Sequence, residues 1–132
     1  MRLILDTNIC IYLIKEQPAS VLDRFTAHPV GDIGVSVITL AELEYGVAKS
    51  SRPARNRAAL EQFVSPLEVA AFDRDATAVY GRVRAQLEKK GQPIGSMDLL
   101  IAAHAISLGV RLITHNVKGF RKVPGLRVED WV

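Results

Sequence analysis

The chain has 132 residues and a formal net charge of +3, with 48% hydrophobic and 23% charged residues. This length suits one domain with a single substantial core, and this composition argues against a disordered chain. Cys10 is the one cysteine, which excludes an intrachain disulfide, and Asp6 and Asn8 interrupt the first apolar run too early for a signal peptide or membrane span. We therefore expect one domain over residues 1–132, in the cytoplasm and without a membrane partner.

Apolar runs that alternate with helical segments predict an α/β fold with a mostly parallel central sheet flanked by helices. The first run, residues 2–5, is apolar throughout and ends at Asp6, which is typical of a buried parallel strand that leads into a helix. Further strands are expected at 33–38, 67–72, 110–114 and, at an edge, 126–128. Helices are expected at 8–15, 18–27, 39–49, 54–64, 73–90 and 96–107, with a short turn at 116–121.

Two helix starts carry acids in recognisable positions. Thr39 and Glu42 match a capping box, which predicts that the third helix begins at Thr39. Ser96 has the place of a cap for the helix that contains Asp98. Both acids are therefore expected in the first turn of a helix.

Four polar side chains are expected at one edge of the sheet, because ligands of open α/β sheets bind outside the carboxyl ends of the strands. Asp6 ends the first strand, and Glu42 begins the helix that follows the second. The helix of Asp98 runs antiparallel to the fourth strand, so its start returns to this edge, where Asn116 also lies. Three carboxylates and one amide should thus converge from distant parts of the chain.

Each acid taken alone also fits a capping role, since an acid in a first helical turn is favourable by roughly 0.3–1 kcal/mol. Their convergence favours a bound cation, because clustered carboxylates repel one another. An all-oxygen ligand set of Asp6, Glu42 and Asp98 suits Mg²⁺, with Mn²⁺ as the alternative, rather than zinc. Such a site supports metal-assisted attack of water on a phosphodiester, with one ion or two.

The remaining polar and apolar patterns have simpler interpretations. His104 should be hydrogen-bonded and semi-buried, Glu44 should face away from Glu42, and Trp131 should cap the core. Basic residues gather in 49–57, 82–90 and 118–127. By default they form solvated surfaces, and a group that flanks the acidic edge would instead bind the RNA backbone. Surplus apolar residues in 8–14 and 40–48 predict a partner surface near the second helix and the 39–49 helix.

Four blocks of the sequence resemble the signature blocks of PIN-domain ribonucleases, and more narrowly those of VapC toxins from VapBC toxin–antitoxin pairs. The blocks are Leu5-Asp6-Thr7-Asn8, residues 38–46, Gly95-Ser96-Met97-Asp98 with residues 101–105, and Ile113-Thr114-His115-Asn116. The likeness covers nearly the whole chain, and the order and spacing of these short motifs make it specific.

The resemblance implies a three-layer PIN-like domain and a Mg²⁺-dependent endoribonuclease toxin of a type II toxin–antitoxin pair. Asp6 and Asp98 would coordinate Mg²⁺, Glu42 would complete the acidic site, and Asn116 would position a ligand or water. The RNA substrate would be structured, such as initiator tRNA or ribosomal RNA. A homodimer would be neutralised by a VapB-like antitoxin, whose C-terminal segment wraps the toxin in a heterotetramer or larger assembly.

Gly119 departs from the family pattern, which often has a fourth acid at this place before an aromatic residue. The departure leaves the number of metal ions open, and it leaves a catalytically weak PIN-fold module that binds RNA or protein as the alternative function. Two other hypotheses fit less well. A phosphohydrolase with an aspartyl-phosphate needs an acid where Asn8 stands. A phospho-receiver domain needs a pair of acids at the end of the first strand and a phospho-acceptor at the end of a central strand. Asp73 follows a strand, but no paired acids precede it.

Overall fold

The computed structural model describes residues 1–132, and its centre is a five-stranded sheet in the order β3-β2-β1-β4-β5. Every neighbouring pair of strands is parallel. The strands, in chain order, are β1 (Leu3–Leu5), β2 (Ile33–Ser36), β3 (Glu68–Ala70), β4 (Arg111–Ile113) and β5 (Val128–Glu129). The predicted α/β fold is confirmed, and the sheet is parallel throughout because even the edge strand β5 runs alongside β4.

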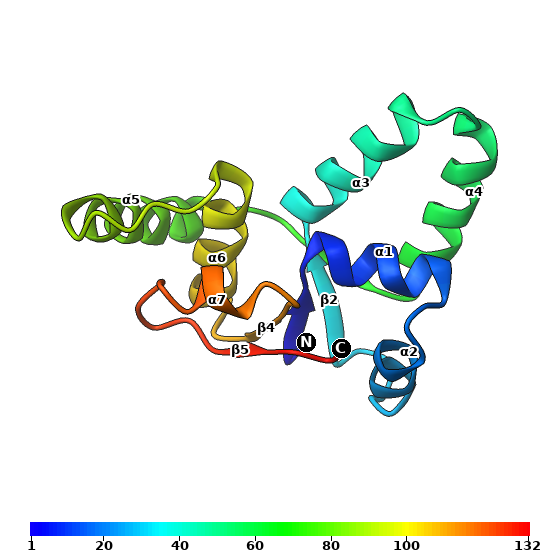
Figure 1. Ribbon diagram of the computed structural model, residues 1–132, viewed down its shortest axis with the longest axis horizontal. Coiled ribbons are helices and arrows are strands. Elements are labelled where there is room, and N and C mark those ends of the chain that lie inside the picture. Colours follow the sequence, from blue (N-terminus) through cyan, green and yellow to red (C-terminus); the bar gives the residue numbers. More distant parts are fainter.

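Helices cover both faces of the sheet, which makes three layers (Figure 1). They are α1 (Thr7–Lys15), α2 (Ala19–Thr26), α3 (Val37–Lys49), α4 (Pro53–Val64), α5 (Arg74–Lys89), α6 (Ser96–Leu108) and α7 (Val117–Phe120). In Figure 1 the first four helices gather on one side of the sheet, and α5, α6 and α7 lie on the other. No helix combines the length and apolar character that a membrane crossing requires.

The central strand β1 supplies both halves of the hydrophobic core, since successive side chains of a strand point to opposite faces. Leu3 and Leu5 pack with the helices α1 to α4, whereas Ile4 packs with α5 and α6. All three residues are fully buried. Trp131 is also buried and belongs to the first of these clusters, so the prediction that it caps the core is confirmed.

Helix α3 begins earlier than the sequence predicts. Strand β2 ends at Ser36, whose hydroxyl accepts a hydrogen bond from the backbone N–H of Ile38 at 3.0 Å, and the helix begins at the next residue. The predicted capping box is therefore wrong: Thr39 is buried with an unpartnered hydroxyl, and Glu42 lies in the second turn. Ser96 is likewise the first helical residue of α6 rather than its cap, which is Gly95.

Ser36, the cap of α3, also has a buried partner far away in the sequence. The Nδ1 atom of His104 on α6 lies 2.7 Å from the Ser36 hydroxyl, and its Nε2 atom lies 3.0 Å from the carbonyl of Ala71. A carbonyl only accepts, so Nε2 carries the proton and Nδ1 accepts from Ser36. His104 is hydrogen-bonded as predicted but is 1% exposed, hence fully buried, and it joins α6 to the ends of β2 and β3.

Replacement of His104 by glutamine should reduce the pH dependence of stability. Burial lowers the pKa of His104 below its ordinary 6.5, and the Ala71 carbonyl and Asp73 offset this only in part. The neutral ring therefore stabilises the fold above pH 6.5, and this contribution is lost as pH falls through the lowered pKa. Urea denaturation should show a smaller loss of unfolding free energy from pH 7 to pH 5 in His104→Gln than in the wild type. Equal losses would contradict this assignment.

Candidate active site

Asp6 lies directly after the central strand and is 5% exposed. Its Oδ1 accepts the backbone N–H of Ile9 at 2.9 Å, so Asp6 is also the N-cap of α1. Its Oδ2 accepts the hydroxyl of Thr114 at 2.5 Å. The Thr114 hydroxyl in turn accepts the N–H of Asn116 at 3.0 Å, which leaves its own proton directed at Asp6. The carboxylate is thus held in one orientation by groups from two distant segments.

Glu42 reaches the same place from α3. The hydroxyl of Thr7 donates to its Oε1 at 2.5 Å, and Thr7 is the neighbour of Asp6 in the chain. This hydrogen bond fixes the end of the Glu42 side chain beside the carboxyl edge of β1. Glu44 instead contacts Arg57 at 2.7 Å, which confirms that it faces away from the site.

Asp98 brings the third carboxylate, from the first turn of α6. Burial and the negative charge of Glu42 raise its pKa above the ordinary value. Burial also raises the pKa of Asp6, with further contributions from the charges of Asp98 and Glu42, while the hydrogen bonds from Thr114 and Ile9 act in the opposite direction. The structure therefore brings the three predicted acids close enough to repel one another.

No basic side chain neutralises this cluster. The ion pairs of the chain all lie elsewhere, and none includes Asp6, Glu42 or Asp98. Carboxylate and hydroxyl oxygens are ligands that suit Mg²⁺ or Mn²⁺, so the donor chemistry fits a hard divalent cation. In their present orientations, however, no three Asp, Glu, His or Cys side chains are grouped tightly enough to hold an ion together.

Asn116 lies just beyond β4 as predicted, but its side chain caps the short helix α7. Its Oδ1 accepts the N–H of Gly119 at 3.3 Å, which leaves its NH₂ group without a hydrogen-bond partner in the chain. A Cβ atom at position 119 would come within 2.6 Å of the Asn116 Nδ2. The absence of a side chain at Gly119 therefore leaves the space that the Asn116 amide occupies. It also means that this position supplies no fourth carboxylate.

Two threonines at the site were not among the predicted residues. Thr7 follows Asp6, and Thr114 is the residue after β4, so each stands at a strand end where a short hydroxyl side chain can reach a neighbouring carboxylate. That position is the signal from which they could have been identified. His115 is exposed, and its Nδ1 lies 3.1 Å from the carboxylate of Asp130, which directs the ring toward the C-terminal segment.

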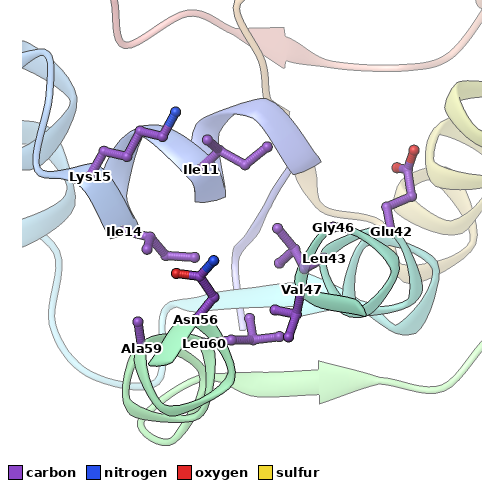
Figure 2. Close-up of a pocket in the computed structure, with 10 residues that line it drawn as sticks. All are labelled: Ile11, Ile14, Lys15, Glu42, Leu43, Gly46, Val47, Asn56, Ala59 and Leu60. Carbon is purple, nitrogen blue, oxygen red and sulfur yellow. The ribbon is translucent and has the colours of Figure 1, made fainter. Parts of the chain in front are cut away.

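An apolar hollow lies beside Glu42, between α1, α3 and α4 (Figure 2). Its walls include Ile11, Ile14, Leu43 and Val47, and the Glu42 carboxylate stands at its rim. Its volume of about 310 Å³ is within the range of ligand pockets. The hollow includes part of the 39–49 helix together with α1 and α4, but not the second helix α2, and its use as a partner surface stays a prediction.

Comparisons with known proteins agree with this architecture. Residues 3–126 match the family model of the PIN domain. The tRNA(fMet)-specific endonuclease VapC of Shigella flexneri is 46% identical over 131 residues, covering 99% of this chain and 98% of that protein. Ribonuclease VapC2 of Rickettsia felis is 44% identical over 128 residues, 96% of each chain.

Solved structures give the same result. DNA-bound VapBC from Salmonella typhimurium contains a chain that superposes with a TM-score of 0.95 at 43% identity, covering 100% of this chain and 99% of that one. VapBC2 from Rickettsia felis, bound to a DNA fragment from the promoter, gives a TM-score of 0.94 at 42% identity over the whole of both chains.

The substitution Asp98→Asn should leave the melting temperature of metal-free protein unchanged or raise it. The folded-state pKa of Asp98 is raised, so its contribution to stability is fully present below its unfolded-state pKa and is lost as pH rises through the folded value. At neutral pH the charged group therefore destabilises the metal-free fold. Mg²⁺ should raise the melting temperature of the wild type by mass action, and Asp98→Asn should remove most of this increase.

Asp23→Asn is the matched control, since Asp23 is an exposed acid on α2, and it should retain the full effect of Mg²⁺. A clear loss of metal-free stability in Asp98→Asn would show instead that Asp98 acts mainly as a helix-capping acid for α6.

Proposed function

The chain belongs to the PIN-domain family and, within it, to the VapC ribonucleases, and we propose that it is a divalent-metal-dependent endoribonuclease toxin. The observation that supports this function best is the convergence of Asp6, Glu42 and Asp98 at one sheet edge without a basic partner. A capping role alone would not require three acids from separate segments to lie so close that their charges raise the pKa of Asp6 and of Asp98.

Asp6, Glu42 and Asp98 would hold the cation, for which we propose Mg²⁺, with Mn²⁺ as the alternative. When bound, the cation would polarise the scissile phosphate and favour the ionisation of water. Thr114 and the Ile9 N–H keep Asp6 fixed, so Glu42 and Asp98 would turn toward it to complete the site. The hydrogen bond from Thr7 would limit the range over which Glu42 turns.

Asn116 would contribute through its free NH₂ group, which can donate to a phosphate oxygen or a water. Gly119 supplies no further carboxylate, so the donor set favours one cation over two. The same residue supports a second candidate function, a PIN-fold module that binds RNA or protein but cleaves weakly.

We propose structured RNA as the substrate, with initiator tRNA as the first candidate because the Shigella relative is a tRNA(fMet)-specific endonuclease. The protein would act in the cytoplasm as a homodimer. A VapB-like antitoxin would bind it in a heterotetramer or larger assembly, in line with the VapBC complexes that its structure resembles. The apolar hollow is a suitable seat for the C-terminal segment of that antitoxin, from which a basic side chain could reach Glu42.

Single amide substitutions of the three acids should each nearly abolish cleavage of purified initiator tRNA. Asp6→Asn, Glu42→Gln and Asp98→Asn should give strongly non-additive losses, because removal of any one carboxylate already disrupts the same cation site. Asn116→Ala should have a smaller effect, since an amide carries no charge. Replacement of Mg²⁺ by Ca²⁺ should preserve RNA binding and suppress cleavage.

The assay uses antitoxin-free protein, with EDTA and the Asp23→Asn variant as controls. Cleavage that persists in EDTA, or in the triple variant, is the outcome that would exclude a metal-dependent nuclease. RNA binding by the wild type without metal-dependent cleavage would favour the binding module.

A further inference from the structure

Tyr45 on α3 is the one aromatic residue of the chain that is strongly exposed, with 66% of its surface accessible. Its hydroxyl makes no hydrogen bond within the chain, and no other aromatic ring stacks against it. The other tyrosines and the phenylalanines are buried or partly buried. A single exposed aromatic ring is common on protein surfaces, so the exposure of Tyr45 gains meaning only from its place next to Glu42 and the acidic site.

Tyr45 lies three residues, or about one helical turn, after Glu42 on α3. Three residues of α-helix advance about 4.5 Å along the axis, and residues three or four apart share one side. Lys49 is four residues further on, and its Nζ lies 4.9 Å from the centre of the Tyr45 ring. Glu42, Tyr45 and Lys49 therefore form a row that leads outward from the acidic site, with an ammonium group at its far end.

We propose that Tyr45 and Lys49 form a subsite for the nucleotide next to the cleaved bond, an inference that rests on the proposed ribonuclease function. The scissile phosphate must lie at the three acids, so a flanking nucleotide passes within reach of the adjacent turn of α3. An unstacked base finds in the Tyr45 ring a face on which to stack. Lys49 covers one side of the ring and supplies a positive charge for the phosphate of the same nucleotide.

Charge favours RNA over a second copy of the chain as the occupant of this surface. Lys49 has no carboxylate partner in the structure. A contact between copies that covered Tyr45 would have to bring a carboxylate of the second copy to Lys49, because an ammonium group buried without a partner is unfavourable. A phosphate supplies the missing negative charge.

The test combines RNA binding with a spectroscopic signal of stacking. Short single-stranded oligoribonucleotides, each with 2-aminopurine at a different position, are titrated with protein in Ca²⁺, and cleavage of initiator tRNA is measured separately in Mg²⁺. Tyr45→Ala should weaken binding about tenfold and abolish the quenching of 2-aminopurine, whereas Tyr45→Phe should retain both because the ring remains. Lys49→Gln should lower the salt dependence of binding by about one phosphate contact, and Lys89→Gln, an exposed lysine at the far end of α5, should not.

The outcomes separate this inference from the function on which it rests. Absence of RNA cleavage by the wild type would overturn the proposed function. Normal cleavage by the wild type, with Tyr45→Ala binding and quenching like Tyr45→Phe, would overturn the subsite alone. Conversion of a dimer to a monomer by Tyr45→Ala, detected by light scattering, together with unchanged quenching, would assign Tyr45 to a contact between copies and would also overturn the subsite.

Discussion

The carboxylate of Asp6 is almost fully buried at the end of the central strand, and much of the surrounding structure keeps it there in one orientation. Burial and two neighbouring acids disfavour its negative charge, which the N–H of Ile9 and the hydroxyl of Thr114 partly stabilise. Because Asp6 begins α1 and stands between β2 and β4, it fixes the starting point of the site. Glu42 and Asp98 are placed relative to this fixed group.

The positions of the strands, of most helices and of the three acids could be predicted from the sequence. They follow from apolar periodicity and from the edge that parallel strands share. The start of α3 was predicted wrongly, at Thr39 instead of Val37. Thr39 and Glu42 satisfy the local rule for a capping box, yet the helix is capped by Ser36, which is also a favoured N-cap residue. The hydrogen bond that Ser36 makes with His104, 68 residues away, could not be predicted from either local rule. The capping contact of Asn116 with Gly119 is local, whereas the hydrogen bonds of Thr7 with Glu42 and of Thr114 with Asp6 join segments that are distant in the sequence.

Helix α3 links three surfaces of different character. Leu43 and Val47 face the apolar hollow, Glu42 meets Thr7 at the acidic edge, and Tyr45 with Lys49 faces solvent. The helix is anchored at its beginning through Ser36, so it presents these side chains from a fixed base. A partner seated in the hollow would therefore touch the same helix that carries a site carboxylate and the exposed ring.

The hydroxyl that orients Asp6 belongs to a residue 108 positions later, and the strand that leads to it, β4, is a direct neighbour of β1. During translation, Asp6 is therefore made more than a hundred residues before the group that holds it. Until β4 leaves the exit tunnel, β1 lacks one of its two partners and the acidic edge is incomplete. A fragment that ends before β4 would therefore lack both the second strand partner of β1 and the hydroxyl that orients Asp6.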